Sequence, residues 1–135
     1  MAGYSGTPLW KKLGYKDGAT SFVEGAPAGY LAMLALPRQI SVKWAARLRA
    51  PVGFVHFFTG SKSALSVKPR TIQNSITPDG IIWISWPKKS SSVATDVTEA
   101  VVREIALPLG LVAIKVCAVD DVWSGLKLVI RKELR

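Results

Sequence analysis

The sequence has little of the chemistry that metal and disulfide sites need, with one cysteine and one histidine in 135 residues. A single cysteine, Cys117, excludes a disulfide within the chain and is compatible with a reducing compartment, so we expect a cytoplasmic protein. Metal sites of the zinc kind need three or four ligands, and neither Cys117 nor His56 has a second residue of its own type. Both fall inside expected buried strands, so we expect core roles for them and no metal site.

Long hydrophobic runs are also missing. The longest apolar runs, Phe54–Phe58 and Gly80–Ile84, have the length of strands, whereas a helix that crosses a bilayer needs about 20 apolar residues. The N-terminus has no uninterrupted apolar segment before a cleavage site, unlike a secretory signal. We therefore expect no membrane partner. The length is usual for one domain, and we expect residues 1–135 to form a single domain.

Acidic residues are scarce in the first half of the chain. Residues 1–70 contain ten Lys and Arg against Asp17 and Glu24, a net charge of +8, whereas residues 71–135 contain eight against seven, a net charge of +1. Such asymmetry occurs in proteins that bind nucleic acid, anionic lipid or phosphorylated ligands. It equally fits a solvated basic face, because the basic residues are scattered and form no dense tract.

Strand and helix signals alternate along the chain. The expected strands cover Ala19–Glu24, Ile40–Trp44, Gly53–Thr59, Ile81–Trp86, Leu111–Val119 and Lys127–Lys132. The expected helices cover Pro8–Leu13, Ala28–Leu36, a segment from Ser61 to Ile76 interrupted near Pro69, and a segment capped by Thr95 or Asp96 that ends near Pro108. A turn is expected at Thr77–Gly80.

This order of elements predicts a mainly parallel sheet covered by helices on both faces. The connection at residues 120–126 is too short for a crossover helix, so the last two strands are expected to be antiparallel to each other. We expect a three-layer, Rossmann-like α/β fold of about six strands with one antiparallel strand near the C-terminus. The pattern resembles a shortened class I methyltransferase fold that lacks one helix–strand unit between Trp44 and Val52, and this resemblance implies the strand order 2-1-3-4-6-5.

Four segments give the chain a family resemblance: MAGYSGTPLWKKLG, TPDGIIWISWPKKSS, ATDVTEAVVREIA and KVCAVDDVWSGLKLV. Together they resemble a small bacterial family, domain of unknown function 3052, over nearly the whole chain; SWPKK and CAVDDVWSGLK are the specific parts. The resemblance implies a stand-alone Rossmann-like domain and brings no established activity or catalytic residues. The first strand of that family resembles one ending in Asn-Ala-Pro, whereas this one ends Glu24-Gly25-Ala26-Pro27.

The residues that hold a methyltransferase cofactor are largely missing. A glycine-rich turn follows the first strand of such an enzyme, but here Ala26 and Ala28 stand where that motif has glycine. A carboxylate near the end of the next strand holds the ribose hydroxyls, and no Asp or Glu occurs between Glu24 and Asp79. Because buried hydroxyls without an acceptor are costly, we expect no bound S-adenosylmethionine and no other cofactor.

Three groups of residues at expected strand ends and turns are candidate ligand contacts. The turn after the first strand precedes a helix whose free N–H groups suit a phosphate, with Arg47 or Arg49 nearby, and Ser61 begins a second such helix. The indole of Trp86 beside Lys88 and Lys89 suits a phosphate or a stacked base. The same residues equally suit a solvated loop that covers a packed tryptophan. Acids in the last connection suit a cation or a general base, or a simple charged turn. The candidate residues are Glu24, Gly25, Ala26, Pro27, Gly29, Ser61, Trp86, Lys88, Lys89, Asp120 and Trp123.

Taken together, these features predict a non-enzymatic binding or regulatory domain that recognises a small anionic ligand or a protein partner through those residues. A fold pattern without its cofactor residues is the basis of that expectation. One alternative is a nucleotide- or S-adenosylmethionine-dependent enzyme with atypical contacts. Another is a nucleic-acid-associated protein that uses the basic first half, whose affinity would fall steeply with salt.

Overall fold

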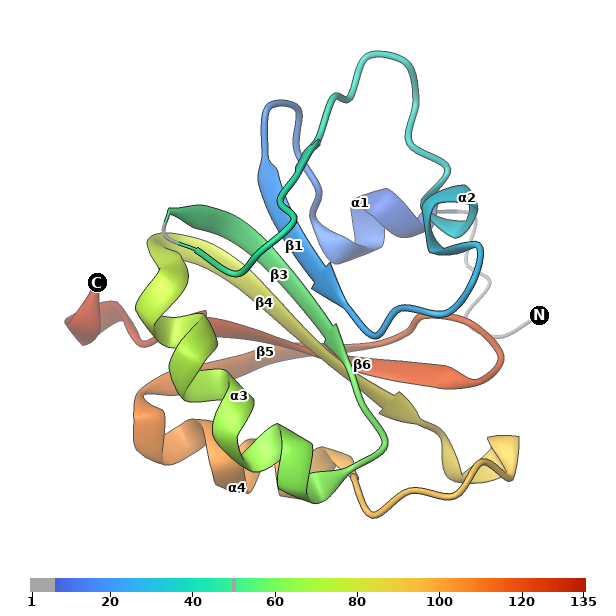
Figure 1. The fold of residues 1–135 in the computed structure, drawn as a ribbon, viewed down its shortest axis with the longest axis vertical. Coiled ribbons are helices and arrows are strands. Elements are labelled where there is room, and N and C mark those ends of the chain that lie inside the picture. Colours follow the sequence, from blue (N-terminus) through green and yellow to red (C-terminus); the bar gives the residue numbers. More distant parts are fainter. Residues whose placement is uncertain (1–6, 50) are drawn as a thin grey trace.

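The computed structural model describes residues 7–49 and 51–135, which form one six-stranded sheet flanked by helices (Figure 1). The strands are β1 (Thr20–Glu24), β2 (Lys43–Trp44), β3 (Val52–Phe58), β4 (Ile76–Pro87), β5 (Leu111–Ala118) and β6 (Trp123–Ile130). The α-helices are α1 (Leu9–Leu13), α2 (Tyr30–Leu34), α3 (Lys62–Ser75) and α4 (Glu99–Ala106). Three short 3₁₀ helices cover Lys89–Ser91, Leu107–Leu109 and Lys132–Leu134.

The sheet has the predicted topology. Its order is β2-β1-β3-β4-β6-β5, the pairs among β1 to β4 are parallel, and β6 runs antiparallel to both of its neighbours. The expectation of a Rossmann-like, methyltransferase-like sheet with one antiparallel strand near the C-terminus is therefore confirmed. The described residues 45–49 and 51, between β2 and β3, contain neither helix nor strand, as the expected loss of one helix–strand unit requires.

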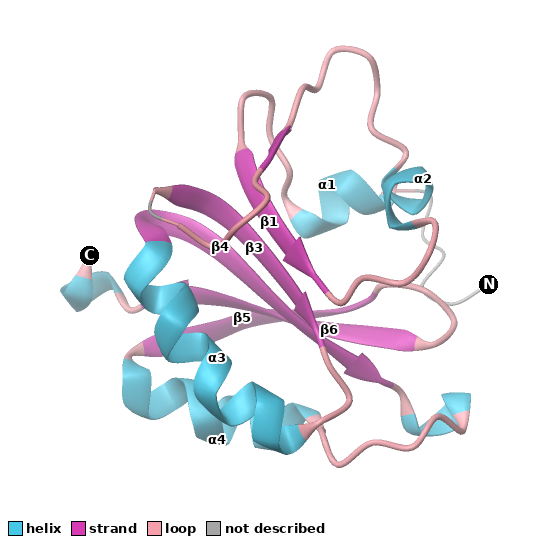
Figure 2. Cartoon of the chain, viewed as in Figure 1, coloured by secondary structure: helices cyan, strands magenta, loops and turns pink. Residues whose placement is uncertain are grey.

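The helices form a layer on each face of the sheet (Figure 2). One face is covered by α3 and α4, whose Leu65, Ile72 and Val102 join the larger hydrophobic core. The other face is covered by α1 and α2, whose Leu13 and Leu34 join a smaller core. The central strands β3 and β4 contribute to both cores, which accounts for their almost continuous apolar sequences. None of the helices formed by the described residues is long and apolar enough to cross a membrane.

The expected turn at Thr77–Gly80 is a bulge within one long strand. The register between β3 and β4 shifts between Val52 and Phe54, so the β4 residues after Ile76 leave the regular ladder. Gly80 lies in this irregular segment, where an added Cβ would come within 2.3 Å of the Ile76 side chain. The Pro-Asp-Gly signal was misread because α3 leads directly into β4, so the chain has no need to reverse there.

Helix α4 begins later than expected, and Thr95 and Asp96 do not cap it. Thr98 caps the helix instead, its Oγ1 accepting a hydrogen bond from the Val101 N–H at 3.3 Å. Asp96 accepts a hydrogen bond from the Lys62 N–H at 2.7 Å, at the start of α3. The Asp96 side chain, expected to cap α4, thus binds the start of α3, which lies close to it only in the folded structure.

Three further elements differ in extent from their predictions. Helix α3 is continuous through the buried Pro69, where a break was expected. Helix α2 has five residues and ends at Leu34, and the next residue, Ala35, has a positive φ of 54°. Strand β2 has two residues, because the preceding expected strand residues pair with nothing in the ladder.

A buried chain of hydrogen bonds fixes the α1–α2 layer to the sheet. The hydroxyls of Tyr15 and Tyr30 lie 2.8 Å apart, Tyr30 shares a 2.8 Å hydrogen bond with Nδ1 of His56, and Nε2 of His56 shares one of 2.8 Å with Ser85. The imidazole of His56 is completely buried, which confirms its predicted core role. Both of its ring nitrogens have a partner, as a neutral imidazole with one donor and one acceptor requires.

Burial lowers the pKa of His56 from 6.5 to about 3. The unfolded chain therefore takes up a proton at His56 between these pH values and the folded protein does not, so acid favours unfolding. We expect the free energy of unfolding to fall by about 1.4 kcal/mol per pH unit on this account as the pH drops below 6.5. Urea unfolding at pH 5, 6, 7 and 8 measures this slope.

The matched variant is His56→Gln, whose amide keeps a donor and an acceptor but does not titrate. Because His56 is the only histidine, this variant should lose most of the slope between pH 5 and 7. An identical slope in both proteins would show that His56 is not held neutral in the folded state.

Candidate functional site

A cleft of about 540 Å³ lies at the carboxyl ends of β1 and β2. We call it the β1–β2 cleft; its lining residues are Val23, Ala26, Pro27, Gly29, Tyr30, Leu31 and Trp44. Its walls are mostly apolar, and its volume is in the range typical of small-molecule sites. The indole of Trp44, 39% exposed, is its largest accessible aromatic group. The arrangement suits a flat, largely apolar ligand group.

The turn between β1 and α2 forms the floor of this cleft. Gly25 has φ of +75°, and an added Cβ would lie 2.5 Å from the carbonyl oxygen of Phe58 at the end of β3. The backbone of the turn therefore fills the space between the ends of β1 and β3, which is where the strand order reverses. Gly29 also has a positive φ, of +83°, but nothing lies within 4 Å of its absent Cβ. The open space is accordingly beside Gly29 and Trp44.

Glu24 does not face the cleft. Its carboxylate accepts a 2.9 Å hydrogen bond from Nζ of Lys68 on α3 and forms an ion pair with it. Because side chains alternate along a strand, Glu24 lies on the α3 face while Val23 faces α2 and the cleft. No carboxylate is among the residues that line the cleft.

Ser61 and its helix start are occupied by the protein itself. The Ser61 hydroxyl accepts a hydrogen bond from the Ala64 N–H at 3.2 Å and so caps α3. The neighbouring Lys62 N–H is bound by the carboxylate of Asp96. The Asp96 carboxylate therefore already occupies the position at which an anion would bind to this helix N-terminus.

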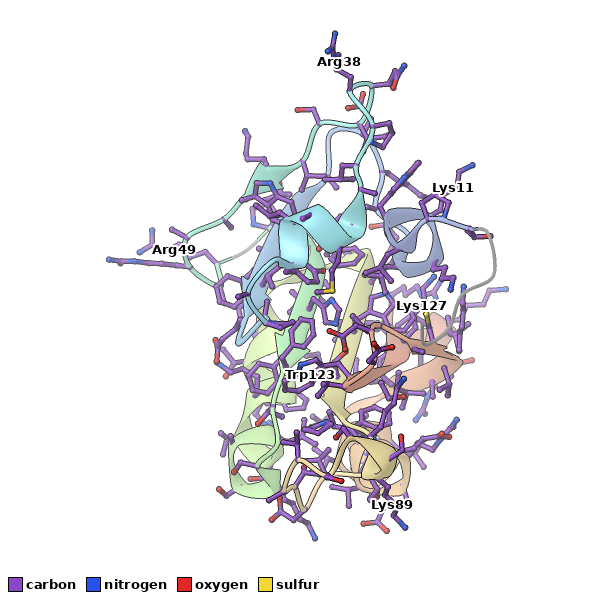
Figure 3. The ribbon with its side chains drawn as sticks, turned by 90° about the vertical axis from the view of Figure 1, so that its right-hand side faces the viewer. Lys11, Arg38, Arg49, Lys89, Trp123 and Lys127 are labelled. Carbon is purple, nitrogen blue, oxygen red and sulfur yellow. The ribbon has the colours of Figure 1, made fainter. Side chains whose placement is uncertain are left out.

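The Trp86–Lys89 segment lies away from the cleft. Trp86 is 7% exposed and packs in the larger core, so its indole is not available for stacking. The Lys88 N–H donates to the Val122 carbonyl at 2.8 Å, and Lys89 is exposed at the end of the molecule opposite Arg38 (Figure 3). The structure does not bring these side chains together with the first turn.

Asp120 closes the β5–β6 hairpin. One of its carboxylate oxygens accepts hydrogen bonds from the N–H groups of Val122 and Trp123, at 2.8 and 2.7 Å. The ring of Trp123 packs edge-to-face on Phe58 at 5.2 Å, and Phe58 packs in the same way on Tyr30 at 5.5 Å. This series of rings connects the hairpin to the wall of the cleft.

Of the expected site residues, Ala26, Pro27 and Gly29 line the cleft, and Gly25 is not among its lining residues. The sequence analysis missed Val23, Tyr30, Leu31 and Trp44 as lining residues. The available signal was Trp44, a large aromatic residue at the end of a strand with alternating polar residues. Arg47 and Arg49 line a separate hollow of about 340 Å³ and not the cleft.

No group of three or more His, Cys, Asp or Glu side chains converges within the part of the chain that the structure describes. Cys117 is buried, and burial raises the pKa of its thiol above the ordinary value. A raised pKa leaves little thiolate at neutral pH, so the thiol is a poor nucleophile.

No protein-family model and no curated protein matches the chain. Among solved structures, a SAM-dependent methyltransferase from Aquifex aeolicus matches with a TM-score of 0.63 at 14% identity, over 90% of this chain and 88% of that one. Magnesium protoporphyrin IX methyltransferase from Synechocystis PCC 6803, with bound SAM, matches with a TM-score of 0.61 at 11% identity, over 90% and 74%. The N-methyltransferase NodS from Bradyrhizobium japonicum WM9 matches with a TM-score of 0.59 at 14% identity, over 91% and 93%. The chain thus has the methyltransferase fold.

The expectation of a non-enzymatic binding or regulatory domain is wrong. Many of the structures that match the chain are those of methyltransferases, and this finding contradicts that expectation. The expectation gave too much weight to the altered turn and the missing carboxylate. Identities of 9 to 14% among these matches indicate that the scaffold tolerates extensive change in its residues.

The residues of the cleft fit one part of S-adenosylmethionine and not another. The indole of Trp44 and the apolar wall suit the adenine ring, and the open space beside Gly29 leaves room for it. The ribose hydroxyls have no carboxylate to bind, because Trp44 ends β2 and Glu24 is bound to Lys68 on the other face. Backbone carbonyls or water would have to accept those hydrogen bonds.

The two glycines of the first turn provide a stability test of this geometry. Gly29→Ala should cost about 1 kcal/mol of unfolding free energy, because alanine at positive φ is strained but meets no neighbour. Gly25→Ala should cost at least about 3 kcal/mol, because its Cβ also meets the backbone of β3. Urea unfolding of both variants checks the difference, and equal losses would contradict the described turn.

Proposed function

We propose that the protein is an S-adenosylmethionine-dependent enzyme with atypical cofactor contacts, which holds the adenosine part of the cofactor in the β1–β2 cleft. The observation that carries the proposal is the position of the cleft, at the carboxyl ends of two parallel strands in a sheet of methyltransferase order. Ligands of open α/β sheets bind at this edge. Bound there, S-adenosylmethionine supplies an electrophilic methyl group for transfer to a nucleophile.

In this proposal the main contact of the chain is an aromatic one. Trp44 stacks on the adenine ring, and Ala26 and Pro27 contact its edge from the floor of the cleft. Tyr30 forms the wall next to them, and its position is fixed by the hydrogen bonds of its hydroxyl to Tyr15 and His56. A wall held in this way keeps its shape without the ligand.

The missing carboxylate has a consequence for affinity. A hydrogen bond to a charged acceptor contributes about 1.5 to 3 kcal/mol, and about 1.4 kcal/mol corresponds to a factor of ten in binding. We therefore expect this chain to bind S-adenosylmethionine at least about tenfold more weakly than a similar cleft that offers a carboxylate to the ribose.

Several finer assignments belong to the same proposal. We propose that the chain is a member of domain of unknown function 3052, because of the segments SWPKK and CAVDDVWSGLK. We also propose that it acts in the bacterial cytoplasm, a reducing compartment with which a single free cysteine is compatible. We also propose that residues 1–135 form one domain, which the shared sheet of the described residues supports. Ala26, Pro27 and Gly29 remain the proposed ligand contacts from the sequence.

Calorimetric titration with S-adenosylmethionine and S-adenosylhomocysteine tests the proposal. We expect saturable binding of both, and we expect Trp44→Ala to weaken it by about five- to 150-fold because base stacking contributes about 1 to 3 kcal/mol. Trp44→Phe retains an aromatic face and should recover most of the affinity. Gly29→Trp should abolish binding, because its side chain would enter the open space of the cleft.

Trp10→Ala is the matched control, since it removes an indole that does not line the cleft. It should leave the affinity unchanged. Transfer of labelled methyl groups to components of a cell extract, lost in Gly29→Trp, is the corresponding activity measurement. Absence of saturable binding of either compound by the folded wild-type protein would overturn the proposal.

A further inference from the structure

Two lysines face each other across the β5–β6 hairpin. Lys115 on β5 and Lys127 on β6 are direct partners in the antiparallel register. Like charges directly opposite on neighbouring strands destabilise a sheet. The side chain of Lys127 is also half-buried, so its charge is only partly screened by water.

A third lysine approaches from the segment after α1. The amino group of Lys127 lies 3.8 Å from where a Cβ on Gly14 would stand, and Lys16 follows Gly14 by two residues. Burial lowers the pKa of Lys127, and the charges of Lys115 and Lys16 lower it further. Nζ of Lys115 donates to the Lys12 carbonyl at 3.2 Å, which holds that side chain near the end of α1.

Carboxylates of the described residues do not neutralise these three lysines. Within residues 7–49 and 51–135, none of Lys16, Lys115 and Lys127 forms an ion pair with a carboxylate. A hollow of about 140 Å³ has Gly14 and Lys16 in its wall, whereas Lys115 and Lys127 are not among its lining residues. Asp79 also lines this hollow, and its charge would oppose a bound anion. Figure 3 shows Lys127 on the side of the hairpin that faces α1.

We propose that Lys16, Lys115 and Lys127 form a binding site for a phosphate group. Ammonium groups are point charges suited to the several oxygen acceptors of a phosphate. Because none of these three forms an ion pair with a described carboxylate, they leave a net positive charge to be neutralised. Binding an anion turns the repulsion across β5 and β6 into attraction toward a shared partner. The site is separate from the β1–β2 cleft, whose lining residues it does not share, and does not depend on the proposed cofactor.

The phosphate can belong to a phosphorylated small molecule or to the backbone of a nucleic acid. Pyrophosphate and a single-stranded oligonucleotide are the two probes that distinguish these sources. If pyrophosphate binds at a lower concentration than the oligonucleotide does, the ligand is a phosphorylated small molecule. Tighter binding of the oligonucleotide, displaced by pyrophosphate, assigns the nucleic acid, and the slope of log affinity against log salt should then fall by about 0.7 for each lysine removed.

Lys127→Met gives the sharpest test, because the site predicts two effects of opposite sign. Without an anion, the variant should unfold about 1 to 4 °C above the wild type, since one of the repelling charges is gone. With pyrophosphate, its affinity should be at least about tenfold lower. Thermal unfolding at constant ionic strength, with and without pyrophosphate, measures both.

Lys115→Thr, a residue that suits a strand, is a second variant with the same expected effects. Lys89→Met is the matched control, since Lys89 is exposed and lies outside the site. It should change neither the unfolding temperature nor the affinity for pyrophosphate. Asp79→Asn should tighten pyrophosphate binding, because it removes the one carboxylate that lines the hollow.

Three results would overturn the proposal. One is the absence of any pyrophosphate-dependent rise in the unfolding temperature of the wild type. Another is a rise of equal size in Lys127→Met and Lys115→Thr, which would mean that the anion acts without these lysines. The third is weaker pyrophosphate binding by Asp79→Asn, the opposite of what three lysines and one opposing carboxylate require.

Discussion

The hydrogen bonds through His56 hold the α1–α2 layer of this fold in place. Helices α1 and α2 have five residues each, too few to be stable on their own, so tertiary contacts must fix them. The bonds run from Tyr15 through Tyr30 to His56 on β3 and end at Ser85 on β4. The Trp83 indole adds a further attachment by donating to the Leu13 carbonyl at 2.7 Å. A neutral imidazole in the sheet thus determines where both helices lie.

The cleft is a consequence of this attachment. Tyr30 is at once a member of the buried hydrogen bonds and a wall of the β1–β2 cleft, so the shape of the cleft depends on groups that no ligand touches. The turn at Gly25, pressed against the end of β3, closes the crevice between β1 and β3. The open part of the cleft therefore lies between β1 and β2, beside Trp44, and not between β1 and β3.

The mainly parallel sheet with its antiparallel last pair could be predicted from local signals: apolar runs, the alternation of strands and helices, and one connection too short for a helix. The resemblance to the class I methyltransferase fold implied the strand order. The cap of α4 and the bulge near Gly80 could not, since Asp96 binds the start of α3 and the chain passes from α3 into β4 without reversing. The cleft was only partly predictable. Ala26, Pro27 and Gly29 follow from the position of the turn, whereas Trp44 reaches them through parallel pairing of β1 and β2.

The two edges of the sheet differ in how they are protected from other chains. Strand β2 offers only two residues to a passing strand, so the loss of the unit that would have covered it exposes few unpaired backbone groups. Strand β5 has eight residues and exposes Val112, Ile114 and Val116, which would make it prone to aggregation if it were regular. Its register shift between Ala113 and Lys115 breaks that regularity, and the lysine places a charge there. The irregularity of β5 thus helps to keep the chain from extending its sheet into that of a neighbour.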